Sequence, residues 1–546
     1  MSLLNILEFL YASYLFNIYI SFLIIVLLFT IYYKNIKELP LRDYSRFIIF
    51  LLIYFLFIYA YTLIVYFAFD QDFASYQLIQ TFNFYRLSFN FAVDNLSLLF
   101  LLLTSFIMPL CILLHYNFSV KQAYCLANNK NISLNFQLKN STSFIILLFL
   151  LFIILFIFFT TLDFFIFFVS FESSVIPLFL FINLYGSRLI SRLKASYYMF
   201  FFTTLSSITF LLSLFFIFYL NGSLNILFLS FNTHTADLQR LLWFSLFIPV
   251  ASKIPVVPFH IWLPEAHVEA PTEGSVLLAS LMLKLGAYFL LRFLIPLLPL
   301  GLKFFIPLTY SLFTLSLLYT SCLIFLQIDL KKIIAYSSIA HMNLGLLGLF
   351  SGTMEGVEGS LYMFFTHGII SSGLFICIGW LYSRFHTRIV LSYTGITFQL
   401  PLLSLMFFIF VLGNLSFPGM GSFVSELLII LSVFQKNLFL GALCLLSSFL
   451  CTLYSFLLYT RVFFGSPLSY FCSNSINTTL HIRAGNTITA YFLTDQTLNV
   501  AHKISRSEYF ILFFLALYTL FTGFFPTVYL NFVESYSYQL LLTLNF

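Results

Sequence analysis

Six ionisable side chains lie in the middle of long apolar stretches of this sequence. They are Glu172, Lys253, Lys284, His341, His367 and Glu426. A charge at the centre of a bilayer costs about 3 kcal/mol on insertion scales, so such residues usually line a cavity or face a partner. Each one alone could be a satisfied polar residue of the core. Six acids and bases together favour a path for protons or other ions.

The mixture of lysine, glutamate and histidine suits proton transfer. Burial lowers the pKa of a lysine and raises that of a glutamate, and a nearby opposite charge does the reverse. A lysine whose partner moves can therefore accept a proton on one side and release it on the other. Histidine titrates near neutrality and can bridge the gaps. Arginine would be a poor substitute, because it does not release its proton.

Prolines beside two of these charges predict broken helices. Pro255 and Pro258 follow Lys253 in SKIPVVPFHIWLP, and each lacks an N–H and clashes with the preceding turn. Freed backbone carbonyls are tolerated at membrane depth only beside protein or water, so we expect a wet, polar pocket around the ammonium. Pro418 and Gly419 predict a second break ahead of Glu426. Broken helices in corresponding positions of two halves mark the site of inverted-repeat transporters.

The stretch PEAHVEAPTEG, at 264–274, concentrates acids and histidine. Its spacing is not that of an HExxH zinc site. We expect a loop at the inner end of the seventh span, which is either an acidic mouth that gathers protons or a plain solvated loop. The sequence contains no dinucleotide fingerprint, no P-loop and no cysteine set for an iron–sulfur cluster. Inert packing is expected for the cysteines in apolar runs, Cys377, Cys444 and Cys451.

The composition requires lipid as the solvent for the elements that carry these residues. Of 546 residues, 61% are hydrophobic and 8% are charged, against about 25% charged in soluble domains. Apolar runs long enough to cross about 30 Å of hydrocarbon predict fourteen spans. They lie at roughly 10–33, 47–69, 92–114, 143–162, 164–184, 196–220, 241–263, 272–296, 304–327, 332–351, 360–383, 400–431, 436–464 and 508–531.

The distribution of basic residues supports this count. With fourteen spans, one side of the membrane receives 18 of the 25 Lys and Arg residues, and the other side receives five. The more basic side is predicted to be the inner side, which places both termini outside. The start of the chain has neither the basic region of a secretory signal nor the Arg-rich pattern of a transit peptide.

The predicted fold is an all-α polytopic membrane protein with two inverted five-helix repeats and broken helices at spans 7 and 12. The expected divisions are 1–142 (spans 1–3), 143–299 (first half, spans 4–8), 300–465 (second half, spans 9–13), 466–505 (a polar stretch) and 506–546 (the last span and tail). The polar stretch is interpreted as an insertion, with a lid on the inner surface as the alternative.

Several blocks of the sequence resemble the antiporter-like subunits of respiratory complex I. The most specific is KIPVVPFHIWLPEAHVEAPTEGSVLLASLMLKLGAYFLLRF, at 253–293. The blocks DLKKIIAYSSIAHMNLG, FFTHGIISSGLF, SRFHTR, FPGMGSFVSEL, FESSVIP and FAVDNLSLLFLLLTSFIMPL are similar to others of that family. The resemblance covers roughly 85–531. Because position 426 holds glutamate, the chain resembles the member of that family that carries glutamate on the twelfth span, where its sister subunits carry lysine.

This resemblance implies roles for the residues of the first half. Glu172 and Lys253 would form the ion pair of a first half-channel, and Lys284 would be the central switch lysine. A secondary path on the inner side would involve His260, His267 and Lys331.

For the second half, the resemblance implies that His341 and His367 connect the switch lysine to Glu426, the outlet of a second half-channel. The burial of charge and the resemblance thus indicate the same six residues.

The function implied is proton translocation in NADH:ubiquinone oxidoreductase, driven by redox chemistry in other subunits. NADH, FMN, iron–sulfur clusters and ubiquinone would belong to the parent complex, with no cofactor or metal on this chain. The expected partners are other membrane-arm subunits, including sister antiporter-like subunits, and phospholipid, but no nucleic acid. Abundant Phe and Tyr indicate an AT-rich organellar gene and hence the mitochondrial inner membrane. The alternatives are an Mrp-type cation/proton antiporter subunit and a scaffold that conducts nothing.

Overall fold

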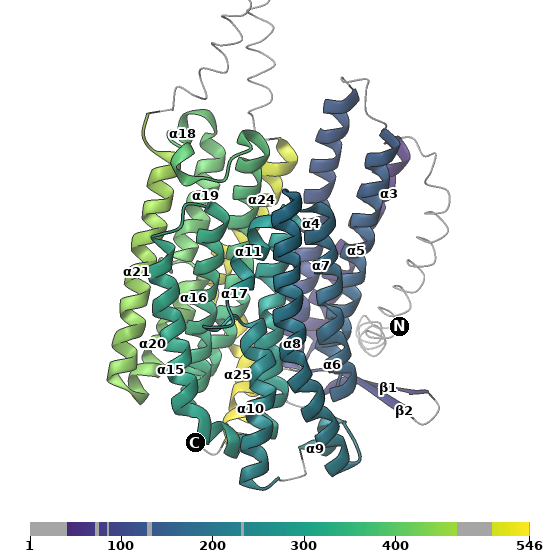
Figure 1. Cartoon of the computed structure of the whole chain (residues 1–546), viewed down its shortest axis with the longest axis vertical. Coiled ribbons are helices and arrows are strands. Elements are labelled where there is room, and N and C mark those ends of the chain that lie inside the picture. The colour runs from purple at the N-terminus through teal and green to yellow at the C-terminus, as the bar shows by residue number, and fades with distance from the viewer. Residues whose placement is uncertain are drawn as a thin grey trace, which may run out of the picture.

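The apolar sequence folds into a bundle of long helices that run roughly parallel to one another (Figure 1). The computed structural model describes residues 41–70, 76–84, 87–127, 134–230, 234–466 and 505–544. Within these ranges, eleven helices are long and apolar enough to cross a membrane. The all-α membrane fold is therefore confirmed. The expected first span, 10–33, and most of the polar stretch 466–505 lie outside the described residues.

The N-terminal part contains two long helices and one hairpin. Helix α3 (Leu41–Ala68) and helix α4 (Asn95–Ala127) match expected spans, and strands β1 (Gln77–Phe84) and β2 (Leu87–Val93) pair antiparallel between them. The hairpin projects at the lower right of Figure 1. The sequence analysis missed it, although residues 87–93, LSFNFAV, begin with the alternation of apolar and polar residues that indicates a strand.

The first predicted half forms a series of helices with several interruptions. They are α5 (Leu134–Thr160), α6 (Phe164–Ser173), α7 (Val175–Tyr185), α8 (Leu189–Asn221), α9 (Ile226–Leu229), α10 (Ala236–Lys253), α11 (Trp262–Glu269) and α12 (Thr272–Leu277). The eighth span continues from α12 through the π-helical turn η2 (Leu278–Met282), α13 (Leu283–Phe289), the π-helical turn η3 (Leu290–Leu294) and α14 (Ile295–Leu297).

The predicted break in the seventh span is confirmed. Helix α10 ends at Lys253, and α11 begins at Trp262. The freed carbonyls find protein donors, since the indole Nε1 of Trp262 donates to the carbonyl of Ser252 at 2.9 Å. The amide of Asn343 lies 3.5 Å from the carbonyl of Pro255. The break is therefore covered by protein groups, as freed backbone in a membrane requires.

The second predicted half contains a second broken helix. Its elements are α15 (Pro299–Ile324), α16 (Leu330–Phe350), α17 (Met354–Phe385), the 3₁₀ turn η4 (Val390–Ser392), α18 (Ile396–Gln399), α19 (Pro401–Asn414), α20 (Gly421–Lys436) and α21 (Leu438–Phe463). The chain leaves helical geometry between α19 and α20, around Pro418 and Gly419, where Gly419 has φ +97°. This confirms the predicted break in the twelfth span.

The last predicted span, 508–531, is wrong in its bounds. Helix α24 (Arg506–Phe524) ends before Pro526, and helix α25 (Thr527–Leu544) follows it. The proline lacks an N–H, and it disfavours helical geometry at the residue before it. Figure 1 shows α25 continuing to the lower end of the bundle. There the hydroxyl of Tyr536 donates to the carbonyl of Leu291 at 2.9 Å.

Three spans that follow the first helix break form much of the interior of the bundle. The candidate spans Thr272–Leu297 and Met354–Phe385 are both entirely buried over their most apolar windows. The span containing α16, Leu330–Phe350, is 89% buried, against 39% for Leu189–Asn221. The elements that carry Lys284, His341 and His367 are thus shielded from lipid by the other helices.

Candidate proton path

Lys284 and His367 meet at the centre of the bundle. Lys284 is completely buried, and its ammonium group lies 3.1 Å from His367 Nδ1. The same group donates to the carbonyl of Ala279 at 2.6 Å. A buried ammonium is tolerated only where its N–H groups find acceptors. A charged Lys284 therefore uses the histidine ring as one of its acceptors.

The backbone around Lys284 is shaped for this contact. Lys284 follows the π-helical turn η2, which contains Ala279, and π turns within helices are frequent at functional sites. Two residues later, Gly286 allows a close approach to the chain that leaves α10. A Cβ at this glycine would lie 2.5 Å from Ile254 Cγ1. The small residue thus holds the Lys284 helix against the break beside Lys253.

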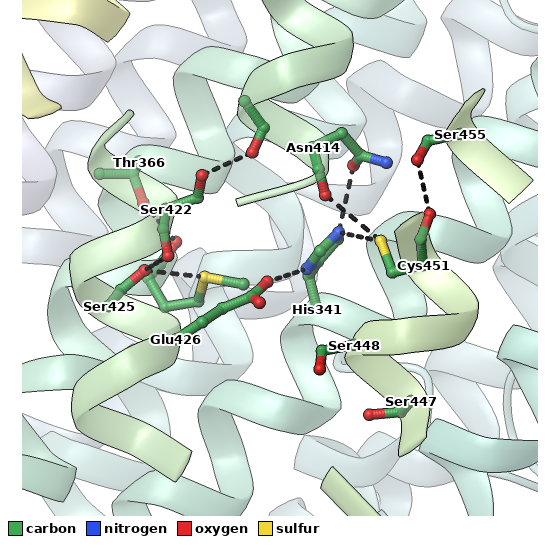
Figure 2. A network of polar contacts seen from close by, with 12 residues as sticks. His341, Thr366, Asn414, Ser422, Ser425, Glu426, Ser447, Ser448, Cys451 and Ser455 are labelled. Carbon is green, nitrogen blue, oxygen red and sulfur yellow. Dashed lines mark hydrogen bonds and ion pairs between the residues drawn. The ribbon is translucent and has the colours of Figure 1, made fainter. Parts of the chain in front are cut away.

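His341 and Glu426 form the next contact of the line. His341 Nδ1 lies 3.2 Å from Glu426 Oε1, and both side chains are buried. The rings of His341 and His367 have centroids 5.8 Å apart. Figure 2 shows the His341 ring between Glu426 on one side and Asn414 with Cys451 on the other. Four predicted residues therefore lie in one line, Lys284, His367, His341 and Glu426.

A small cavity opens beside this line between α15, α16, α20 and α21. It has a volume of about 20 Å³ and is lined in part by His341, Glu426, Ser447, Cys451 and Tyr454. A cavity needs about 10–15 Å³ and two or more polar partners to hold a water molecule. The space next to the His341–Glu426 pair fits a water molecule.

Lys253 and Glu172 lie close in the fold, but they do not form the direct ion pair that the resemblance implies. No Lys253 nitrogen lies within 4.0 Å of a Glu172 carboxylate oxygen. The Lys253 ammonium instead donates to the carbonyl of Phe171 at 3.2 Å and lies 4.4 Å from the centre of the Phe171 ring. Its Nζ is 3.5 Å from Ser174 Oγ. Protein groups, rather than an open pocket, surround this ammonium, and its exposure is 2%.

The three residues of the secondary path are buried at separate points. Lys331 donates to the carbonyl of Ala270 at 2.7 Å. Both ring nitrogens of His267 are buried without a hydrogen-bond partner, and the ring stacks on Phe375 with centroids 4.6 Å apart. His260 packs edge-on against Tyr319. The structure does not join these side chains to one another by a hydrogen bond.

The acidic stretch 264–274 is helical, which corrects the expected loop. It forms the end of α11 and the start of α12, and Pro271 separates the two helices. Pro264 is tolerated because it lies in the first turn of α11. The acids make specific contacts rather than a solvated surface. Lys332 Nζ lies 2.8 Å from Glu265 Oε1, and Ser187 Oγ donates to Glu269 Oε2 at 2.8 Å.

Two features of the site were missed in the sequence. Asn414 ends α19, and its Oδ1 lies 3.1 Å from His341 Nε2. Cys451, expected to pack inertly, instead contacts polar groups, since its Sγ donates to the carbonyl of Asn414 at 3.3 Å and lies 2.8 Å from the Tyr454 hydroxyl. An asparagine four residues before a helix-breaking Pro-Gly pair was a usable signal. Nothing in the sequence around Cys451 indicated its neighbours.

A further buried charge pair joins the start of α4 to the π-helical turn η3. Arg292, near the end of the eighth predicted span, is buried and paired with Asp94. Its guanidinium carbon lies 4.5 Å from the centre of the Tyr76 ring. Arg292 is expected to stay charged, because arginine does not release its proton in proteins. This pair is therefore suited to structure rather than to proton exchange.

Comparison with known proteins agrees with this architecture. The family model for the NADH:quinone oxidoreductase/Mrp antiporter transmembrane region matches residues 161–451. NADH-ubiquinone oxidoreductase chain 4 of Marchantia polymorpha is 41% identical over 411 residues, covering 75% of this chain and 79% of the relative. The protein of the same name from Chondrus crispus is 36% identical over 488 residues, covering 88% and 90%.

Solved structures share the fold at lower identity. A chain of respiratory complex I from Thermus thermophilus with bound NADH superposes with a TM-score of 0.74 at 23% identity, covering 90% of this chain and 94% of that chain. A chain of the Mrp complex from Dietzia sp. gives 0.76 at 18% identity, covering 97% of both chains. The chain belongs to the NADH:quinone oxidoreductase/Mrp antiporter membrane family and, within it, to the NADH-ubiquinone oxidoreductase chain 4 proteins, also called NADH dehydrogenase subunit 4.

Proposed function

We propose that this chain is a proton-translocating membrane subunit of NADH:ubiquinone oxidoreductase. The observation that carries the proposal is the buried line from Lys284 through His367 and His341 to Glu426. Ionisable residues inside a membrane protein that face the interior and meet one another mark proton relays. The names of the relatives support the same assignment.

Each residue of the line has a role that its chemistry permits. Lys284 gives its proton to His367 Nδ1, because that nitrogen lies 3.1 Å from the ammonium nitrogen, within hydrogen-bond distance. His341 passes a proton to Glu426 across the 3.2 Å contact. The step between the two rings needs a small rotation or a bridging water, since their centroids are 5.8 Å apart.

Glu172 and Lys253 would control this line from the first half. Glu172 Oε1 is buried without a hydrogen-bond partner, while the Lys253 ammonium is held by Phe171 and Ser174. A rearrangement that brings the carboxylate to the ammonium would favour the charged lysine, and separation would favour proton release. His260, His267 and Lys331 would lie on the inner input route.

The energy for translocation would come from other subunits. In this proposal, electron transfer from NADH through FMN and iron–sulfur clusters to ubiquinone takes place elsewhere in the complex, and this chain carries no redox centre. Its partners would be other membrane-arm subunits, including sister antiporter-like subunits, and phospholipid. It would lie in the mitochondrial inner membrane with both termini on the intermembrane-space side.

Two inverted halves, 143–299 and 300–465, would provide alternate access to the line. Each half contains one broken helix, at 254–261 and 415–420. Lys253 lies at the first break, and Glu426 lies in the helix that follows the second. Broken helices in corresponding positions are the arrangement that exposes a central site to one side at a time.

Substitution of the first-half residues tests the proposal. Lys253→Ala or Glu172→Ala in an assembled complex should lower the number of protons pumped for each NADH oxidised. The measurement is proton uptake by proteoliposomes at a matched rate of NADH oxidation. Unchanged pumping stoichiometry in both variants would contradict the proposed role.

The fold also fits an Mrp-type cation/proton antiporter subunit, as the superposition on the Mrp chain indicates. The two functions differ in what drives the proton. Comigration of the chain with NADH dehydrogenase activity in mild detergent would support the complex I subunit. Sodium-dependent proton flux by an assembly without flavin would support the antiporter.

A further inference from the structure

The two ring nitrogens of His341 face different chemistry. Nε2 lies 3.1 Å from Asn414 Oδ1, an amide oxygen that can only accept a hydrogen bond. Nδ1 lies 3.2 Å from Glu426 Oε1. A neutral histidine carries its hydrogen on one nitrogen, and its hydrogen-bond partners decide which one. The amide oxygen therefore favours the form of His341 with hydrogen on Nε2.

Cys451 lies beside Asn414 on the Nε2 side of the His341 ring. Its thiol hydrogen goes to the carbonyl of Asn414 at 3.3 Å, which leaves the sulfur as an acceptor. The sulfur then faces the Tyr454 hydroxyl at 2.8 Å and His341 Nε2 at 3.6 Å. Both acceptors beside Nε2 thus favour a hydrogen on that nitrogen.

We propose that Asn414, assisted by Cys451, is a positioning residue that keeps a hydrogen on His341 Nε2, so that the ring exchanges protons only at Nδ1. The inference rests on the proposed function and deepens it, because it assigns the ring nitrogen at which His341 exchanges protons. With Nε2 occupied, the Nδ1 lone pair and the Glu426 oxygen share a single proton.

The transfer between the two groups is balanced without any further reactant. In one state His341 is an imidazolium whose Nδ1–H donates to the Glu426 carboxylate. As the proton moves, the Nδ1–H bond breaks and an O–H bond forms on Oε1, which leaves a neutral ring and a neutral carboxyl. If the neutral ring carried its hydrogen on Nδ1 instead, the free lone pair would be on Nε2, which faces Asn414 and Cys451, and Nδ1 could not receive a proton beside Glu426.

The helix break explains how an asparagine reaches this position. Asn414 is the last residue of α19, directly before the interruption at 415–420. Figure 2 shows its side chain directed at the His341 ring, opposite Glu426. The end of α19 at the break therefore positions the Asn414 amide oxygen beside His341.

Two substitutions of Asn414 in the assembled complex separate positioning from packing. Asn414→Leu keeps the volume but removes the acceptor, whereas Asn414→Gln keeps an uncharged amide oxygen that can accept from Nε2. A choice between the two neutral forms exists only when the ring is deprotonated. Pumping by the leucine variant should therefore fall relative to the unsubstituted complex as the pH rises, by about three- to tenfold for the loss of one hydrogen bond.

The readout is the ratio of variant to unsubstituted pumping across a pH series. For the glutamine variant, which adds no titratable group, this ratio should stay constant with pH. The titratable groups that face or adjoin His341 are Glu426 on α20, His367 on α17, and Cys451 and Tyr454 on α21. All of them are retained in both variants, so a difference in pH trend reports the Nε2 acceptor. Equal losses in both variants at every pH, or normal pumping by the leucine variant, would overturn the inference.

A matched pair of cysteine substitutions tests the second acceptor. Cys451→Ala should lower pumping by less than the leucine substitution but with the same pH trend. Cys377→Ala, also a buried cysteine but ten residues beyond His367 on α17, should not. If Asn414→Leu prevents assembly, the trend is read from Cys451→Ala, and its absence there rejects the inference. Normal pumping by Lys284→Ala would instead reject the proposed function itself, so the two failures are distinguishable.

Discussion

At the scale of single residues, the site depends on which atoms can release a proton. Lys284 is completely buried and donates to one carbonyl and one imidazole nitrogen. An ammonium group in this setting has a proton acceptor at 3.1 Å, and the neutral lysine that remains needs no counter-charge. The charged form has hydrogen-bond acceptors for its N–H groups, and the neutral form has no charge to compensate, so the core can hold either form.

Lys284→Arg tests this requirement. The guanidinium keeps the positive charge but does not deprotonate, so proton pumping should be abolished while the complex still assembles. Pumping and NADH oxidation are measured together in proteoliposomes.

The control for this substitution is Lys303→Arg, at an exposed position near the start of α15. It should leave pumping unchanged. Pumping by Lys284→Arg at the normal stoichiometry would show that release of the Lys284 proton is not needed.

At the scale of elements, one glycine joins the Lys284 helix to the break beside Lys253. A side chain on Gly286 would meet both Ile254 Cγ1 at 2.5 Å and the Ile254 backbone nitrogen at 3.3 Å. Interiors are packed too densely to absorb an extra methyl group without movement. The contact therefore fixes the spacing between the elements that carry the two lysines.

Gly286→Ala should destabilise the assembled subunit by about 1–3 kcal/mol through overpacking. Thermal denaturation of the purified complex, followed by loss of this subunit, measures the effect. Ile254→Ala removes the clashing Cγ1, so the double variant should be more stable than Gly286→Ala alone. Additive losses from the two substitutions would show that the two side chains do not compete for this space.

At the scale of the whole molecule, the buried pair of Asp94 and Arg292 ties distant segments together. The carboxylate lies at the start of α4, and the guanidinium belongs to η3 at the end of the eighth span. The neighbouring Asn95 amide donates to the carbonyl of Phe532 on α25 at 2.9 Å. Residues more than 400 positions apart in the chain thus meet in the fold.

Asp94→Asn should destabilise the protein by about 3–5 kcal/mol, because it leaves a buried arginine without its counter-charge. Replacing both partners, as in Asp94→Leu with Arg292→Met, should recover most of this loss. The yield of assembled complex and its thermal midpoint measure the change.

The matched control is the exposed pair of Asp237 and Arg240, 3.0 Å apart. Asp237→Asn should have little effect, because exposed ion pairs contribute little stability. A similar loss from both aspartate substitutions would contradict the distinction between the buried and exposed pairs.

The sequence by itself determined the membrane fold, both helix breaks and the identity of the line residues. These follow from local rules, since lipid accepts only apolar helices, proline interrupts a helix, and charge in an apolar span needs a partner. Residues such as Lys284 and Glu426 could therefore be selected before any contact was known.

Only the tertiary structure decided which of these groups meet. It joined Lys284 to His367 and His341 to Glu426, left Glu172 near Lys253 without a direct ion pair, and brought Asn414 and Cys451 to one histidine ring. Helix packing and small interruptions, such as the turn before Lys284, set these contacts to within an ångström. Residues remote in the chain contribute to each of them, so no local pattern specifies the result.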